Sequence, residues 1–90
     1  MKIAELEGRG DLRLLLFLRE KGEANISEVP KALGISSQTL YYKVIKKMKK
    51  LGLIKTKKET AFPPTHVICL TDKGRRVADL LSEIERVLEE

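Results

Sequence analysis

Apolar residues recur with helical spacing in several segments of the chain. The first segment, residues 11–22, has leucines on most of its sides, so this helix is expected to be largely buried, with Asp11 as its N-cap. A short amphipathic segment ends at Gly34, and a longer one covers residues 36–51. A short helix, a tight turn containing glycine and then a longer helix are typical of a helix-turn-helix.

Two strands and a last helix are expected after this motif. LIKTKKE and HVICL alternate or are rich in β-branched residues, and the prolines of TAFPPT separate them, which predicts a hairpin with a long loop. Residues 72–90 form a long amphipathic helix. The predicted order is α-α-α-β-β-α, a winged helix-turn-helix that is mainly α with a small β-hairpin wing. We expect one domain over residues 1–90, with the winged helix proper at about 11–75.

The predicted helix at residues 36–51 has two different faces. At about 100° per residue, the apolar side chains gather around Met48 and are expected to face the core; they are Leu40, Tyr41, Val44, Ile45 and Leu51. The opposite side carries Thr39, Lys43, Lys46 and Lys50, with Tyr42 at its border. Like charges on one helix repel one another, so this face is expected to meet a polyanion.

Charge is concentrated in the same part of the chain. The net charge is +5, but residues 1–35 are neutral, residues 36–58 carry eight lysines and no acid, and residues 59–90 sum to −3. A concentrated basic block suggests a polyanionic partner that approaches from one side. The chain has one cysteine, Cys69, no apolar run long enough to span a membrane and no secretory signal, so a cytoplasmic location is expected.

Double-stranded DNA is the polyanion that a helix-turn-helix fits best. The start of its second helix enters the major groove, where Gln38 can pair with adenine and Thr39 can offer a hydroxyl or a methyl group. The candidate contacts on this helix are Ser36, Ser37, Gln38, Thr39, Tyr42, Lys43, Lys46, Lys47 and Lys50. The candidate contacts on the wing are Lys55, Lys57, Lys58, Thr60 and Thr65.

The sequence resembles the winged helix-turn-helix transcription regulators of the MarR type and their short archaeal relatives. In those families the second helix ends in Leu-Gly-Leu-Ile and the wing closes with Leu-Thr-x-x-Gly; here these motifs are Leu51-Gly52-Leu53-Ile54 and Leu70-Thr71-Asp72-Lys73-Gly74. The resemblance implies a DNA-binding transcription regulator. The MarR wing commonly carries an Asp-Arg pair at its tip, whereas this chain has KKETAFPPTH. The chain is also shorter than a full MarR protein, so no effector is implied.

The last helix has more apolar residues than one core can use. Val77, Leu80, Ile84 and Val87 recur at intervals of three and four, which is the seam of a coiled coil, and Leu81 and Leu88 add a second stripe. We expect these six residues to pack partly on their own domain and partly against a second copy, so the protein would bind DNA as a homodimer.

The sequence is also compatible with other functions. The only histidine, His66, and Cys69 do not have the spacing of a metal site, and no catalytic motif or cofactor-binding loop is present, so we expect neither an enzyme nor a cofactor. A module that binds an acidic protein is a rival interpretation, and so is an architectural protein that coats DNA without sequence preference. A membrane-surface helix is a weaker alternative, because the apolar face is needed for the core.

Overall fold

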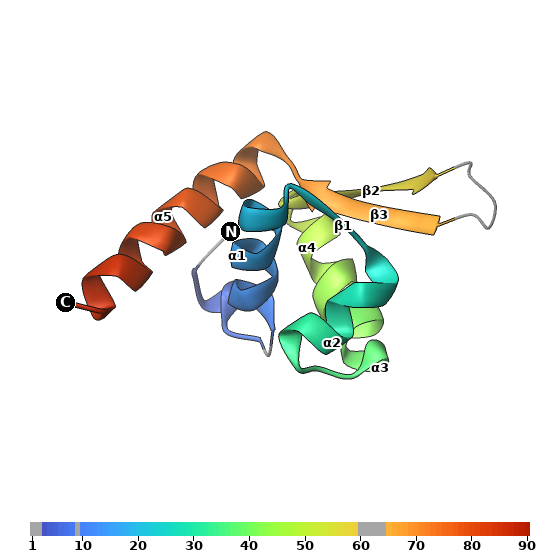
Figure 1. Cartoon of the computed structure of the whole chain (residues 1–90), viewed down its shortest axis with the longest axis horizontal. Coiled ribbons are helices and arrows are strands. Elements are labelled where there is room, and N and C mark those ends of the chain that lie inside the picture. The colour runs from blue at the N-terminus through green and yellow to red at the C-terminus, as the bar shows by residue number, and fades with distance from the viewer. Residues whose placement is uncertain (1–2, 9, 60–64) are drawn as a thin grey trace.

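The chain forms a mainly helical structure with a small antiparallel sheet (Figure 1). The computed structural model describes residues 3–8, 10–59 and 65–90. The elements, in chain order, are a 3₁₀ turn at Ile3–Leu6, α1 at Asp11–Lys21, β1 at Glu23–Asn25, a 3₁₀ turn at Ile26–Glu28, α2 at Val29–Leu33, α3 at Ser37–Thr39, a π-helical turn at Leu40–Ile45, α4 at Lys46–Lys50, β2 at Ile54–Glu59, β3 at Thr65–Leu70 and α5 at Asp72–Leu88. The run from α3 to α4 is one helix, which we call the lysine-rich helix (residues 37–50). This arrangement confirms the predicted winged helix fold.

The sheet has one more strand than the sequence predicted. Its order is β1-β3-β2, and both pairs are antiparallel. β2 and β3, which we call the wing, pair from Ile54 opposite Leu70 to Glu59 opposite Thr65. β1 adds Ala24 opposite Ile68. Three residues are too few to show a strand pattern, and β1 forms because β3 offers it a partner.

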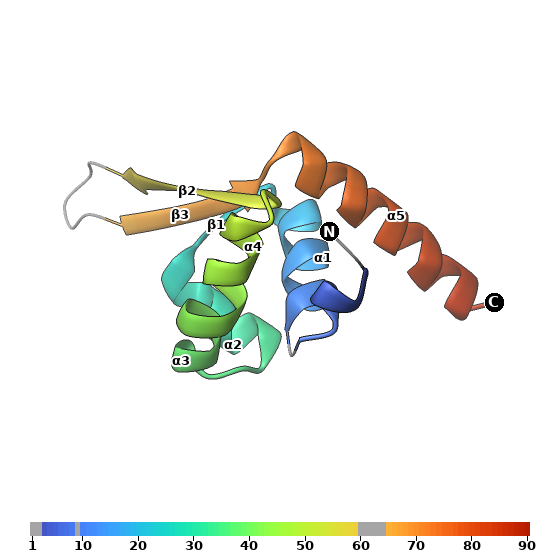
Figure 2. The same ribbon diagram turned by 180° about the vertical axis from the view of Figure 1, so that it is seen from behind.

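The core lies where α1, the lysine-rich helix and the sheet meet. Fully buried side chains come from all three: Leu14, Leu15 and Leu18 of α1, Leu40 and Met48 of the lysine-rich helix, and Ile68 of β3. α1 lies between α5 and the lysine-rich helix in both views (Figures 1 and 2). α5 and the wing project toward opposite ends of the molecule, whose extents are 45 × 24 × 22 Å.

Hydrogen bonds join the base of the wing to α5. The Thr71 hydroxyl donates to the Gly52 carbonyl at 2.6 Å and accepts from the Gly74 N–H at 3.0 Å, while the Thr71 N–H donates to the Leu53 carbonyl at 3.1 Å. A β-carbon at position 74 would overlap the Leu53 carbonyl oxygen and lie 2.9 Å from the carbonyl carbon. The two motifs that carry the family resemblance therefore bind each other. Gly74 and Thr71 are needed for this close approach, whereas Gly52 has open space around it and adopts a φ of 74°. These residues shape the fold rather than the chemistry of a site.

The predicted N-cap at Asp11 is wrong. Gly10 occupies the cap position with φ of 90°, and Asp11 is the first helical residue, with no exposed surface. A carboxylate cannot both cap the helix in solvent and lie inside the protein. Asp11 instead forms an ion pair with Lys47 of the lysine-rich helix.

Candidate nucleic-acid interface

The lysine-rich helix begins at a serine cap, Ser36. The Thr39 N–H donates to Ser36 Oγ at 3.0 Å, and the Ser36 hydroxyl donates to Thr39 Oγ1 at 2.9 Å. These bonds satisfy one of the backbone donors at the helix start, and they use the Ser36 O–H as a donor, while the Thr39 hydroxyl accepts and keeps its own O–H available. Ser37 and Gln38 lie between them and are exposed. The first turn therefore presents Ser37 and the amide of Gln38 outward.

The exposed side of the lysine-rich helix is basic and aromatic. Leu40, Val44 and Met48 fix the opposite side in the core. The exposed residues after the first turn are Tyr41, Tyr42, Lys43, Lys46, Lys49 and Lys50. Lys49 was absent from the predicted set. Since residues 36–58 contain no acid, nothing in this part of the chain neutralises these cations.

Tyr41 was predicted to face the core, and this is wrong, because its side chain is 45% exposed. The prediction assumed α-helical geometry throughout, whereas residues 40–45 form a π-helical turn. Hydrogen bonds from i to i+5 widen the turn, so each residue advances by less than the α-helical angle. The accumulated difference turns Tyr41 outward. Tyr42 is 74% exposed, so two adjacent tyrosines stand on the surface.

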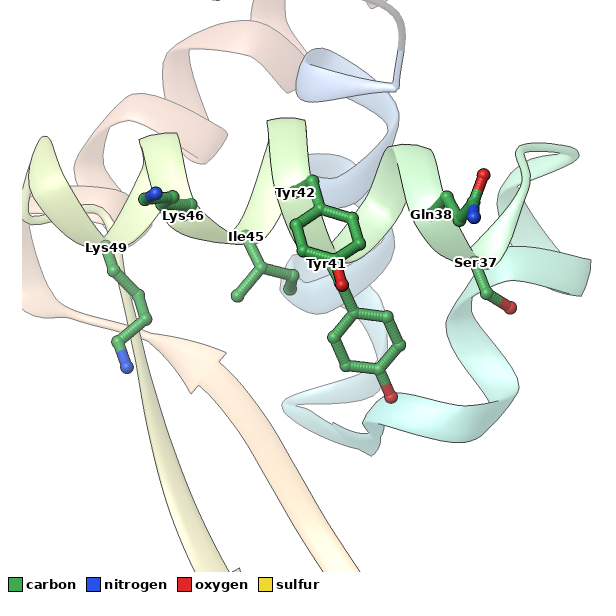
Figure 3. Close-up of a pocket in the computed structure, with 7 residues that line it drawn as sticks. All are labelled: Ser37, Gln38, Tyr41, Tyr42, Ile45, Lys46 and Lys49. Carbon is green, nitrogen blue, oxygen red and sulfur yellow. The ribbon is translucent and has the colours of Figure 1, made fainter.

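A hollow of about 620 Å³ lies on this exposed side. Figure 3 shows Tyr41 and Tyr42 projecting near its middle beside Ile45, with Gln38 toward one end and Lys46 and Lys49 toward the other. Ser37 completes the lining. The surface therefore combines an amide, two aromatic rings and two cations along successive turns of one helix.

Lys47 does not share this exposed face. Its ammonium group pairs with the Asp11 carboxylate, and the Lys47 side chain is only 33% exposed. Gly8 makes room for the pair, because a β-carbon there would lie 2.5 Å from Asp11 Oδ2 and 2.6 Å from Lys47 Nζ. The other carboxylate oxygen of Asp11 is buried without a hydrogen-bond partner among the described residues. Lys47 thus compensates a buried charge, a role that its place in a run of lysines did not reveal.

The wing carries three of the predicted lysines. Lys55, Lys57 and Lys58 are exposed on β2, and Lys57 Nζ lies 3.1 Å from a carboxylate oxygen of Glu23 on β1. The strand register places Lys58 opposite His66, which is also exposed. Thr60 lies outside the described residues, and Thr65 is described only as a backbone position of β3. Two lysines, Lys55 and Lys58, therefore extend the basic surface from the helix onto the wing.

α5 exposes a different kind of surface. Val77 and Leu81 are half-buried and pack against the core. The remaining members of the predicted interface, Leu80, Ile84, Val87 and Leu88, are exposed, with Leu80 at 66% and Leu88 at 78%. An apolar groove of about 500 Å³ runs beside them and is lined by Ile3 and Leu6 of the N-terminal turn together with Val77, Leu80, Leu81, Glu83 and Ile84.

The described residues contain neither a candidate metal site nor a candidate membrane span. Residues 3–8, 10–59 and 65–90 hold no group of three histidine, cysteine or carboxylate side chains that could bind a metal ion. No helix in this part of the chain is long and apolar enough to cross a membrane.

Comparisons with known proteins agree with the geometry. The model of a helix-turn-helix domain family matches residues 12–57, just over half of the chain. The structure is similar to that of a transcriptional regulator homologue from Pyrococcus horikoshii, with a TM-score of 0.81, 29% identity and coverage of 99% of this chain and 89% of that one. It is also similar to a protein from Enterococcus faecalis described as a MarR-family transcriptional regulator, with a TM-score of 0.82, 27% identity and coverage of 97% and 78%. No protein of curated function matches the sequence. The chain belongs to the helix-turn-helix domain family, in the winged form of that fold.

Proposed function

We propose that the protein is a transcription regulator that binds double-stranded DNA as a homodimer. The observation that carries the proposal is the basic surface of the lysine-rich helix and the wing, where seven of the eight lysines of residues 36–58 are exposed and no acid occurs in that segment. In a helix-turn-helix the second helix lies in the major groove and its first residues contact base edges. Similarity to a transcriptional regulator homologue and to a MarR-family regulator supports this assignment.

The proposal divides the basic surface into two roles. Exposed lysines bind phosphates without regard to sequence and supply most of the affinity. The lysines with this role are Lys43, Lys46, Lys49, Lys50, Lys55 and Lys58. Gln38 reads a base pair, since its amide can donate to and accept from adenine together. Lys47 is assigned to Asp11 instead, because a lysine that leaves this pair would strand a buried carboxylate.

The wing and the dimer complete the proposed complex. The segment of the wing that would contact DNA, residues 55–66, lies on the backbone or in the minor groove. The exposed leucines of α5 pack against a second copy, which removes apolar surface from water on both subunits. Two lysine-rich helices would then reach successive major grooves about 34 Å apart, so the DNA site would be a pseudo-palindrome. The proposal includes no catalytic step.

Selection of bound sequences from random duplex DNA tests the proposal. Enrichment of a palindrome supports a sequence-specific dimer, whereas tight binding without enrichment would indicate an architectural protein. A salt titration accompanies the selection: if each subunit neutralises about four or five phosphates, the slope of log K against log salt is on the order of −7 to −9 for the dimer. Failure to bind any duplex, together with binding to an acidic polypeptide, would replace this proposal with a protein-interaction module.

A further inference from the structure

The hollow on the lysine-rich helix has an apolar centre that phosphate binding does not explain. Ile45 is almost completely buried at its floor, and the exposed rings of Tyr41 and Tyr42 stand beside it (Figure 3). Lysines alone are sufficient for contact with the DNA backbone, and they are hydrated there. An uncovered patch of aromatic and aliphatic surface at the centre of a basic face therefore indicates a partner group that is itself apolar.

The major groove offers one apolar group, the C5-methyl of thymine. The charge around the hollow fits duplex DNA, because Lys46 and Lys49 line it and no acid occurs on this helix. If the partner were an apolar side chain of another protein, the lysines around the hollow would have no role in binding it. The charge around the hollow therefore favours a base edge in the groove over a protein surface.

The spacing along the helix places the hollow close to the base pair that Gln38 would contact. Tyr41 and Tyr42 follow Gln38 by three and four residues, which is about 4.5–6 Å along a helix that rises roughly 1.5 Å per residue. Successive base pairs are stacked about 3.4 Å apart. The tyrosines would thus meet bases one or two steps from that pair.

We propose that Tyr41, Tyr42 and Ile45 form a pocket that receives the C5-methyl group of a thymine, one or two base pairs from the pair contacted by Gln38. This inference rests on the proposed DNA binding and names a feature of the DNA sequence that the lysines do not determine. It adds Tyr41, which only the π-helical turn brings to the surface, to the residues that determine specificity.

Replacing thymine by deoxyuridine tests the pocket, because this change removes the methyl group and leaves the base-pairing hydrogen bonds intact. Each thymine of the selected duplex is replaced in turn, and the dissociation constant is measured at fixed salt. Each half-site should contain one thymine at which this replacement weakens binding about fourfold, because the methyl contact is lost. Changing both half-sites together should weaken binding by on the order of tenfold. If selection enriches no sequence, random duplex pools made with thymine and with deoxyuridine are compared in the same way.

Four variants identify the residues that sense the methyl group. Tyr41→Ala and Tyr42→Ala should each bind the thymine and deoxyuridine duplexes equally, whereas Tyr41→Phe, which keeps the ring, should retain the preference for thymine. Gln38→Ala should retain the thymine preference while it loses discrimination at its own base pair. Thermal unfolding of each variant confirms that it is folded before its affinities are compared.

The outcomes separate this inference from the proposed function. Equal affinity of the parent protein for thymine and deoxyuridine at every position would overturn the pocket but leave DNA binding intact. A thymine preference that survives in both Tyr41→Ala and Tyr42→Ala would also overturn it, because the methyl group would then be sensed elsewhere. If no duplex binds at all, both proposals are wrong.

Discussion

The lysine-rich helix and α5 are both amphipathic, but the fold uses their faces differently. The apolar side of the lysine-rich helix is buried in the core through Leu40, Val44 and Met48, and its polar side stays exposed. α5 gives the core only Gly74 and Ala78 as fully buried residues and leaves a row of leucine, isoleucine and valine in solvent. One helix therefore leaves cations uncovered and the other leaves apolar surface uncovered.

This difference assigns the two surfaces to partners of different chemistry. A uniformly basic face gains from a polyanion, and its affinity should depend steeply on salt. An exposed apolar stripe gains from burial, which is not weakened by added salt and does not require a charged partner. Residues 72–90, which comprise α5 and the two residues after it, carry six acidic and four basic side chains, a net charge of −2 that disfavours DNA at that end and leaves it available to a second copy.

The largest expected effect on stability comes from the contact between α5 and the base of the wing, where Gly74 packs against Leu53. Gly74→Ala would push a β-carbon into the Leu53 carbonyl group and separate α5 from the base of the wing. We expect the variant to lose more than about 4 kcal/mol of unfolding free energy, which is most of the stability of a small domain. Urea unfolding measures this loss.

Gly22→Ala is the matched control for this contact. Gly22 has φ of 85°, but nothing lies within 4 Å of the position that a β-carbon would take there, so only the left-handed backbone is penalised, by about 1–2 kcal/mol. Equal stability of the two alanine variants would show that α5 does not approach Leu53 closely.

The next largest effect on stability distinguishes Lys47 from the exposed lysines of the same helix. Lys47→Met leaves the Asp11 carboxylate buried and without its cation, and we expect a loss of about 3 kcal/mol. Lys46→Met, one position earlier and exposed, should change stability by less than about 0.5 kcal/mol. Thermal or urea unfolding of both variants compares them directly. If the two variants were equally stable, Lys47 would not be needed to compensate Asp11 and would again be a candidate DNA contact.

The apolar surface of α5 is tested by placing charge on it. Leu80→Asp together with Ile84→Asp should give a monomer in sedimentation analysis. Because two linked half-sites gain from effective concentration, affinity for the palindrome should fall by about 100-fold, or roughly 2.7 kcal/mol. Arg75→Ser with Arg86→Ser lowers the net charge equally on the opposite side of α5 and should remain dimeric. A dimer that persists in the double aspartate variant would place the interface elsewhere.

Much of the fold could be predicted because it depends on local signals. Gly34 ends α2 with positive φ, as its place after an apolar repeat indicated, and Gly22 and Gly52 follow their helices with positive φ as well. The core face of the lysine-rich helix followed from apolar spacing, since Leu40, Val44 and Met48 are buried. β1 could not be predicted in this way, because Glu23–Asn25 contains a single buried residue and is a strand only by pairing with β3.

The candidate site was less predictable than the fold, since its distinctive features depend on tertiary structure. Asp11 and Lys47 are 36 residues apart in the chain, and no spacing rule connects them. The π-helical turn that exposes Tyr41 has no signature in the residues LYYKVI, which are compatible with an ordinary α-helix. A basic block can therefore be located from sequence, whereas the direction in which each side chain points requires the packed structure.

The smallest effect distinguishes affinity from base discrimination on the lysine-rich helix. Lys46→Ala should weaken binding to all duplexes about equally and reduce the salt slope by about 1 for each subunit, since one phosphate contact is lost. Arg75→Ala removes one cation from α5 and should leave the slope unchanged, because that surface lies away from the proposed DNA. Gln38→Ala should also keep the parent slope, but relax the preference at one base pair, worth about 1–3 kcal/mol. If Lys46→Ala and Arg75→Ala lowered the slope equally, the measured salt dependence would report net charge alone, and the comparison between the two surfaces would lose its basis.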